Sequence, residues 1–406
     1  MRLQLEAGHG LHPFILGMTF KEVMREIQHY ESIVPSVRFT YREQNHLEHP
    51  LTLNLEQNGL VFYFEPISQR LFQIEINLGS DDLNLFFKRD GREIDFMGPS
   101  LPPRLNFLYE VFGATTPGIY DAESQLFKLR YPCMEFHFPI ANQYQKYFEK
   151  SNLNIRVDYP DGAAPVASKM KFFYSYKLED EPKLPPLPPV SPSISPSNAV
   201  YFEQIGIDFK GTVTLMDRYP TVSLSLGEPL QRVLSIFGDP EATFPRQSGT
   251  GVRRSMKKKD GYVLNYFSRG IDILMDGVLH EVDMIRLFTN FPGHPLFNVY
   301  QRANFAIADT AVANREEETF TTEEKLSNTP TPPLPKTEPS SSLLFSSTLD
   351  DLKVALGEPS EPLVHNPASS ANPYGPSHFY VYDKSIFEVI RNGHLASLTL
   401  YGGLEE

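Results

Sequence analysis

Four stretches of the chain repeat one pattern of apolar and polar positions, in which a helical segment precedes alternating strands. At residues 17–28, 105–113, 230–240 and 349–359, apolar residues recur at the spacing of a helix with one buried face. The last three stretches end in a glycine that suits a helix C-cap, with a proline shortly after it. In the first stretch, Thr19 and Glu22 have the spacing of a capping box.

Each predicted helix is followed by runs in which apolar and polar residues alternate. Asn58-Gly59, Arg269-Gly270, Asp276-Gly277 and Asn392-Gly393 mark the turns between these runs. A three-stranded meander with one apolar face needs a cover, and the preceding helix can supply it. We therefore predict an α+β fold of about four tandem helix-plus-antiparallel-meander units, whose sheets are free to pair edge to edge.

Two stretches rich in proline and serine interrupt this pattern. Residues 180–198 and 309–346 hold little that a core could bury, so we expect both to be disordered insertions. They divide the chain into three parts: 1–179 with two N-terminal units, 199–308 with a third unit and an aromatic extension at 287–305, and 347–406 with the C-terminal unit.

Composition excludes several classes of protein. A net charge of −13 has the wrong sign for a fold-wide nucleic-acid surface, so we expect no nucleic-acid partner. The sequence has no run of 18 apolar residues, so we expect no transmembrane helix. The N-terminus lacks the pattern of a signal peptide. The single cysteine, Cys133, rules out a disulfide framework and is expected in the core. These features favour a cytosolic or organelle-surface protein.

Signatures of enzymes are absent from the sequence. It has no GxxxxGK[ST] phosphate loop, no GxSxG elbow, no GxGxxG after a strand and no HExxH. Asp272 and Asp276 are the carboxylates that most resemble an acid–base pair. However, Asp276 precedes Gly277 as a turn residue does, and we interpret Asp272 as an edge or solvent-side residue. We predict no catalytic residues, no cofactor and no metal site.

Two polar stretches are candidate contact sites. KLPPLPP at 183–189 has the spacing of a polyproline ligand for SH3-type domains, although a plain spacer would read the same way. The loop at 246–259 is basic, and it either contacts anionic lipid or a partner, or is simply solvated. Its candidate lipid or anion contacts are Arg246, Arg253, Arg254, Lys257, Lys258 and Lys259.

The aromatic extension, LFTNFPGHPLFNVYQRANF at 287–305, contains five aromatic residues and no carboxylate. Pro292-Gly293 allows a type II turn, and residues 296–305 alternate like an extra strand with one buried face. His294 is expected to cap backbone groups in the turn or contact a partner, and Arg302 to pair with an acid or reach a partner. The extension is thus either core or a docking surface, with the candidate docking residues Phe291, His294, Tyr300 and Arg302.

Five blocks carry a resemblance to a known family. They are LNLEQNG (53–59), FGATTPGIY (112–120), LNYFSRGIDILMD (264–276), TNFPGHPLFNVYQRANF (289–305) and IFEVIRNGHLASLTLYG (386–402). In order and spacing they resemble the phagosome assembly factor family, with the basic loop and the two insertions matching least.

The resemblance implies a cytoplasmic, non-enzymatic autophagy adaptor that associates peripherally with the phagophore. It also implies a WD40 β-propeller partner that supplies much of the phosphoinositide recognition. The alternative is a protein that binds or handles phosphoinositides or other lipids directly, through the basic loop or an apolar cavity between units.

Overall fold

The computed structural model describes residues 1–80, 83–98, 101–148, 159, 161–175, 182–186, 202–218, 220–246, 261–307, 343–365 and 375–402. Both predicted insertions, 180–198 and 309–346, therefore lie largely outside the described residues, and their disorder stays a prediction. The chain divides into two compact units, Met1–Pro188 and Pro189–Glu406.

The first unit contains two sheets and short helices. Its five-stranded sheet has the order β3-β2-β1-β8-β9, with β1 parallel to β8, and its eight-stranded sheet has the order β10-β11-β12-β13-β7-β6-β5-β4. The elements are β1 (Arg2–Glu6), β2 (Gly10–His12), β3 (Phe14–Ile15), α1 (Phe20–His29), β4 (Arg38–Thr40), β5 (Leu51–Leu55), η1 (Glu56–Asn58), β6 (Leu60–Phe64), β7 (Leu71–Asn77), β8 (Asn84–Arg89), β9 (Arg92–Met97), α2 (Leu105–Phe112), β10 (Ile119–Asp121), β11 (Leu126–Tyr131), β12 (Met134–Pro139), η2 (Asn142–Tyr144), α3 (Gln145–Phe148) and β13 (Lys169–Phe173).

The second unit repeats this arrangement of sheets. The orders are β16-β15-β14-β21-β22, with β14 parallel to β21, and β17-β18-β19-β20-β26-β25-β24-β23. The elements are β14 (Gln204–Asp208), β15 (Thr212–Leu215), β16 (Val222–Ser225), α4 (Leu230–Phe237), β17 (Ala242–Pro245), β18 (Tyr262–Tyr266), η4 (Phe267–Arg269), β19 (Ile271–Met275), β20 (Val282–Phe288), β21 (Asn304–Ile307), β22 (Leu343–Leu344), α6 (Leu349–Leu356), β23 (Leu363–His365), β24 (Ser377–Tyr382), β25 (Ser385–Val389) and β26 (Leu395–Tyr401).

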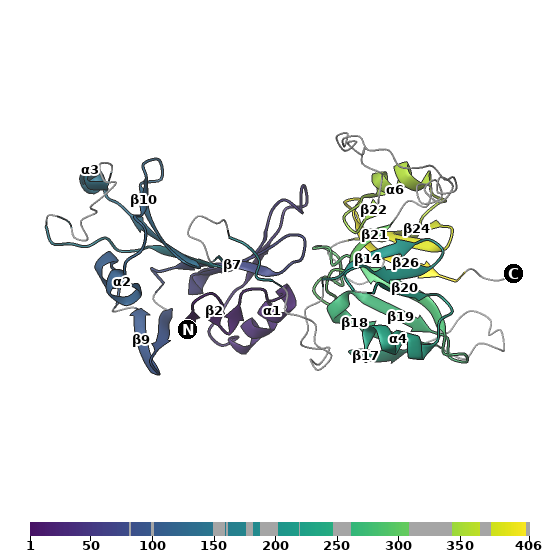
Figure 1. The fold of residues 1–406 in the computed structure, drawn as a ribbon. Helices are drawn as coiled ribbons and strands as arrows, with labels where there is room; N and C mark the ends of the chain where they lie inside the picture. The colour runs from purple at the N-terminus through teal and green to yellow at the C-terminus, as the bar shows by residue number, and fades with distance from the viewer. Residues whose placement is uncertain are drawn as a thin grey trace, which may run out of the picture. The chain divides into compact units, whose positions relative to one another are not determined.

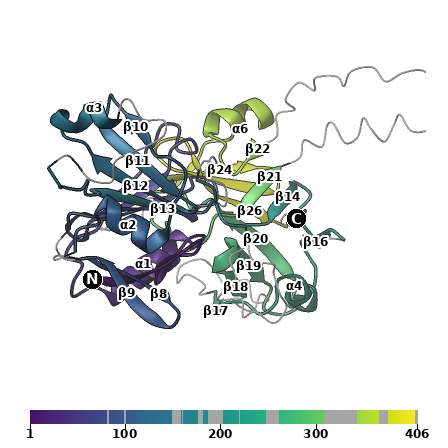
Figure 2. The same ribbon diagram turned by 60° about the vertical axis from the view of Figure 1, so that its left-hand side comes forward.

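Each unit is built from two copies of one motif, a helix followed by a four-stranded meander (Figures 1 and 2). We number these repeats from first to fourth; they comprise α1 with β4–β7, α2 with β10–β13, α4 with β17–β20, and α6 with β23–β26. The two meanders of a unit join through their last strands, β7 with β13 and β20 with β26. The predicted α+β fold with tandem helix–meander units is confirmed.

The prediction of three strands in each meander was short by one strand. The missing strand is the outermost one of each repeat, namely β4, β10, β17 or β23, and each has only three or four residues. So short a strand cannot show a recognisable alternation of apolar and polar positions. The predicted meanders also gave no sign of the five-stranded sheets, which join the start of one repeat to the start of the next.

The helix ends follow the signals read from the sequence. Thr19 and Glu22 form the predicted capping box of α1, and Thr348 with Asp351 forms a second one at α6. The helices α2, α4 and α6 end at glycines with positive φ, since a left-handed conformation is cheapest for a residue without Cβ. These C-cap glycines are Gly113, Gly238 and Gly357, with φ of 83°, 76° and 88°.

A tyrosine at the end of the second meander strand fastens each of these glycines. The hydroxyls of Tyr131, Tyr266 and Tyr382 donate to the carbonyls of Gly113, Gly238 and Gly357 at 2.9, 3.0 and 3.0 Å. A hydrogen bond of this kind contributes about 1 kcal/mol. The first repeat has Leu55 at the corresponding position and ends its helix without glycine, so three of the four repeats share this contact.

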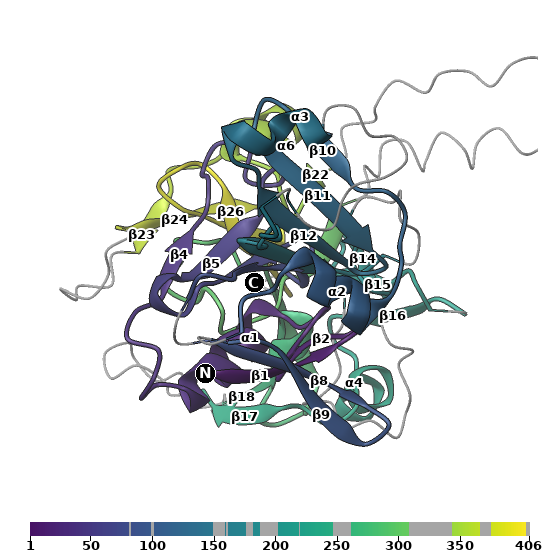
Figure 3. The same ribbon diagram turned by 90° about the vertical axis from the view of Figure 1, so that its left-hand side faces the viewer.

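The helices and the five-stranded sheet cover the same face of the eight-stranded sheet. In the first unit, α2 lies between the two sheets (Figure 3). The centroid of its Phe112 ring lies 5.7 and 5.8 Å from the ring centroids of Phe87 and Phe96 in the five-stranded sheet. It lies 5.9 Å from that of Phe136 in the eight-stranded sheet. The core of the unit is therefore on this side of the sheet.

The aromatic extension has the predicted turn but not the predicted strand. The His294 N–H donates to the Phe291 carbonyl at 3.1 Å around Gly293, whose φ is 106°, as a type II turn requires. Strand β21 begins only at Asn304, so the prediction of a strand from residue 296 was wrong. The reason is Asn298, which adopts φ of 66° and donates its N–H to the Asn290 side chain at 2.7 Å, so the chain turns instead of extending.

Candidate functional site

A row of polar side chains crosses the face of the second unit's eight-stranded sheet that lies opposite its helices. Asn265 pairs with Asp272 across β18 and β19, and Asp272 pairs with Arg286 across β19 and β20. Beyond Arg286, Ser397 on β26 lies opposite Glu388 on β25. We call these five residues the polar row. The aromatic extension packs against it, because His294 and Tyr300 both bond to its carboxylates.

Glu388 is the centre of one half of the polar row and is only 4% exposed. Its carboxylate accepts hydrogen bonds from His294 Nε2 at 3.0 Å, Arg286 at 2.7 Å and Ser397 Oγ at 2.7 Å. Leu296 donates its N–H to Nδ1 of His294 at 3.2 Å, which leaves Nε2 as the donor to Glu388. Burial alone would raise the pKa of Glu388, but the contacts with His294, Arg286 and Ser397 outweigh it and lower the pKa to about 2.

Asp272 is the centre of the other half. The Tyr300 hydroxyl and the Asn265 amide donate to its two oxygens, each at 2.8 Å. Burial raises the pKa of Asp272 despite these hydrogen bonds. Burial and the neighbouring carboxylate also raise the pKa of Tyr300, whose ring stacks on Phe288 at 3.8 Å. The interpretation of Asp272 as a solvent-side residue therefore does not hold.

The structure places the four candidate docking residues inside the second unit. Phe291, His294, Tyr300 and Arg302 are all less than 9% exposed. Phe291 stacks on the His394 ring at 4.9 Å, and Arg302 donates from Nε to the Thr289 carbonyl at 2.7 Å. His294 caps the backbone as one alternative predicted. In this conformation the four side chains hold the extension on the sheet, and a docking role for them stays a prediction.

Only the second unit has such an extension between equivalent strands. Residues 289–303 join β20 to β21, whereas the equivalent strands of the first unit, β7 and β8, are joined by residues 78–83. The extension is thus an addition to the shared plan. Its two contacts with carboxylates, His294 with Glu388 and Tyr300 with Asp272, hold it across β18, β19, β20, β25 and β26.

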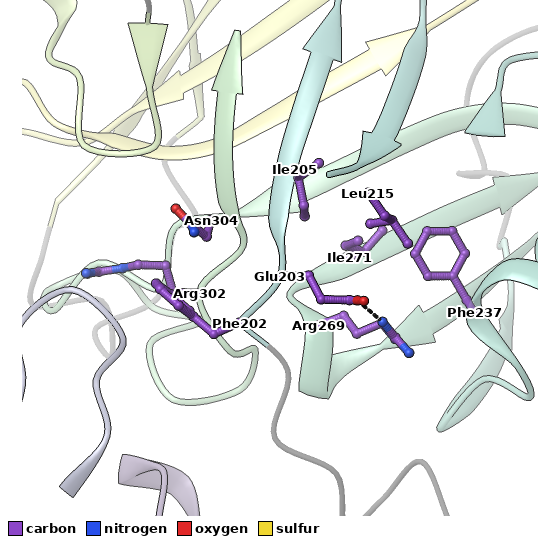
Figure 4. A pocket seen from close by; sticks show the side chains of 9 residues that line it. All are labelled: Phe202, Glu203, Ile205, Leu215, Phe237, Arg269, Ile271, Arg302 and Asn304. Atoms are coloured by element: carbon purple, nitrogen blue, oxygen red, sulfur yellow. Dashed lines mark hydrogen bonds and ion pairs between the residues drawn. The ribbon is translucent and has the colours of Figure 1, made fainter. Parts of the chain in front are cut away.

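A second cluster of charges lies on the core side of the same unit (Figure 4). Glu203 accepts from Arg218 at 2.8 and 3.2 Å and is also paired with Arg269. Burial by itself raises the pKa of Glu203, but the two arginines outweigh it and the pKa is lowered. Glu203 and Arg269 line a small cavity with room for about one water molecule. Its lining residues are Phe202, Glu203, Ile205, Leu215, Phe237, Arg269, Ile271, Arg302 and Asn304.

The basic loop is largely beyond the described residues. Of its six candidate lipid contacts, Arg253, Arg254, Lys257, Lys258 and Lys259 lie outside them. Arg246 is described and exposed, and its N–H donates to the Gly261 carbonyl at 2.8 Å. This bond continues the pairing of β17 with β18 to the last described residue before the loop.

In the part of the chain that the structure describes, no group of three or more His, Cys, Asp or Glu side chains is placed to hold a metal ion. In the same residues no helix is both long and apolar enough to cross a membrane. Cys133 is buried, as predicted. The motif at 183–189 is described only in part, and its SH3-type contact stays a prediction.

Sequence reasoning missed the acceptors at the centre of the site. Glu388 stands in the apolar run IFEVI, and Glu203 precedes a strand without any motif around it. The one available signal was a lone charge inside an otherwise apolar strand, which a solvent-facing position explains equally well.

Comparison with known proteins places the chain in a family. A family model described as phagosome assembly factor 1 matches residues 10–401. A PHAF1 protein of Arabidopsis thaliana is 31% identical over 98% of this chain and 92% of its own length. PHAF1 proteins of Drosophila melanogaster and Caenorhabditis elegans are 28% and 25% identical, over 98% and 97% of this chain and 92% and 91% of their own lengths. No solved structure matches.

The match spans both units and all four repeats, and the relatives are covered over nearly their whole length. A role in phagosome assembly and autophagy follows from the family's name. The chain belongs to the phagosome assembly factor 1 family.

Proposed function

We propose that this chain is a non-enzymatic adaptor of autophagy, recruited to the phagophore in complex with a WD40 β-propeller partner. Membership of a family named for assembly supports a role in bringing proteins together. The polar row supports a structural role for its charged groups. Its carboxylates, Glu388 and Asp272, accept hydrogen bonds from His294, Arg286 and Tyr300 of the same unit.

The observation that carries the proposal is a recurring exposed side chain at the sheet edges. Ile119, Phe244 and Leu363 occupy the same register position in the outermost strands of the second, third and fourth repeats. They are 73%, 56% and 69% exposed. Edge strands carry backbone groups that can pair with another chain, and exposed apolar residues on them are typical of binding surfaces. Their recurrence favours a scaffold with several contact points.

Copurification with the propeller partner tests the role of these edges. We expect the triple variant I119S/F244S/L363S to bind the propeller about tenfold more weakly, since it removes three exposed apolar contacts without touching the core. Circular dichroism should show unchanged folding. The control variant M216S/V278S/L279S removes exposed apolar residues elsewhere and should bind normally. Equal loss in both variants, or in neither, would contradict the role of the edges.

A second candidate function is direct binding of phosphoinositides or other lipids through the basic loop. It is favoured by the six cations in the sequence of the loop and by the exposure of Arg246, the one of them that the structure describes. The two functions differ in which protein reads the membrane, the adaptor itself or its propeller partner.

A further inference from the structure

The second and fourth repeats are equivalent, yet among the residues that the structure describes only the second has a helix over its outermost strand. Both repeats close their units, and Tyr120 in β10 has its counterpart in Val364 in β23. The register shows this, because Tyr120 pairs with Phe127 and Val364 pairs with His378, each four residues before the tyrosine that bonds the C-cap glycine.

In the second repeat this position is covered by α3. The Phe148 ring of α3 lies 5.9 Å from Tyr120 and 5.3 Å from Phe127, measured between centroids, and Phe148 is buried. The helix belongs to residues 140–168, which join β12 to β13. An aromatic side chain on a short helix therefore completes the core at this edge.

The fourth repeat has no room in its chain for such a helix. Residues 390–394 alone join β25 to β26, and Val364 is 59% exposed. Helix α6 of the same repeat also exposes an apolar residue and buries fewer residues than its counterpart α2. It carries Val354, 83% exposed, where α2 has Glu110, and it buries only Leu352 where α2 buries three residues. Two apolar side chains thus face solvent where the second repeat has a covered tyrosine and a glutamate.

The charges on α6 and on the segment that leads from it to β23 indicate what could cover Val364. Asp350, Asp351, Glu358 and Glu361 are exposed on α6 and the segment after it, and Lys353 is paired with Glu358 at 3.1 Å. Such an acidic surrounding attracts a basic segment and repels an anionic membrane. The equivalent cover, α3, itself carries Lys146.

We propose that Val364 is the centre of a docking surface for a short amphipathic helix of a partner protein. This helix is basic and places an aromatic side chain over Val364, as Phe148 lies over Tyr120. Apolar contact supplies the affinity, and the acidic surrounding orients the helix. The proposal does not require the partner to be the propeller.

The test uses a helix-stapled synthetic peptide of residues 141–150 with tryptophan in place of Phe148 (F148W). The full chain has no tryptophan, so the emission reports on the peptide alone. We expect the emission to shift to shorter wavelength on binding, and the affinity to fall about tenfold in V364S. High salt should weaken binding. The V278S variant changes a similarly exposed valine, 53% against 59% for Val364, and should bind normally.

Several results would overturn the proposal. The absence of any emission shift with the unmodified chain is one, and equal affinity of V364S and V278S is another. Equal binding of a peptide with alanine at position 148 would remove the aromatic contact. If light scattering shows a dimer that V364S converts to a monomer, the occupant is a second copy. If phosphatidylserine vesicles sediment the unmodified chain but not V364S, it is a membrane. Peptide binding and propeller copurification are separate measurements, so either can fail alone.

Discussion

Replacing Glu388 with alanine (E388A) is expected to lower the free energy of unfolding of the second unit by about 3 kcal/mol. The substitution leaves the buried His294 and the partly buried Arg286 without their shared carboxylate. It also removes one of the two carboxylate contacts that hold the aromatic extension on the sheet. Urea unfolding followed by circular dichroism measures the change.

Two further variants decide whether the lost partner is the cause. Removing Glu388 together with Arg286 in E388M/R286M should cost less than E388A, since only His294, and no longer the Arg286 cation, is left without the carboxylate. Removing Glu358, whose pair with Lys353 is exposed, should change stability by less than about 1 kcal/mol. If E388A lowers the free energy of unfolding by less than about 1 kcal/mol, the contacts of Glu388 do not stabilise the second unit as proposed.

The same carboxylate predicts a dependence of stability on pH. The pKa of Glu388 is lowered from 4.5 to about 2, so its contribution is complete above pH 4.5 and is lost as the pH falls toward 2. The difference corresponds to about 3 kcal/mol. Asp272, whose pKa is raised, acts in the opposite direction but is present in both proteins. The gap in stability between the unmodified chain and E388A should therefore narrow over this pH range.

Replacing Gly270 with alanine (G270A) is expected to cost at least about 3 kcal/mol and to displace the aromatic extension. Gly270 has φ of +71°, and a Cβ there would lie 2.3 Å from the Gln301 carbonyl oxygen and 2.8 Å from the Ala303 nitrogen. Both atoms are backbone, so the extension itself must move. Thermal unfolding gives the loss, and limited proteolysis within 287–305 reports the displacement.

A matched glycine separates the two causes of that loss. Gly91 has φ of +73° with open space around it, so G91A should cost only about 1 kcal/mol from backbone strain. The excess in G270A measures the packing of the extension against the hairpin. If the two variants lose equal stability, the extension is not held there.

Local signals in the sequence were enough for much of the fold. The capping residue Thr19, the C-cap Gly238 and the turn glycine Gly270 each act through the few residues around them, so spacing alone locates them. Pairing between repeats is different. The contact of β20 with β26 joins residues more than a hundred positions apart, and neither strand's sequence identifies the strand with which it pairs.

The polar row could not be predicted for the same reason. An outward-facing glutamate in a strand normally indicates solvent, and Glu388 has that pattern. It is buried only because an extension from another repeat covers it, bringing His294 to it across 94 positions of sequence. The alternation of residues 296–305 was likewise outweighed by the left-handed conformation of Asn298.

The most direct test of the adaptor account is recruitment to the phagophore in cells that lack the propeller partner. The account predicts that the chain stays dispersed in such cells and returns to the membrane when the partner is restored. Recruitment that persists without the partner, and that is lost when the charges of residues 246–259 are reversed, would contradict it. The chain itself would then be the protein that reads the lipid.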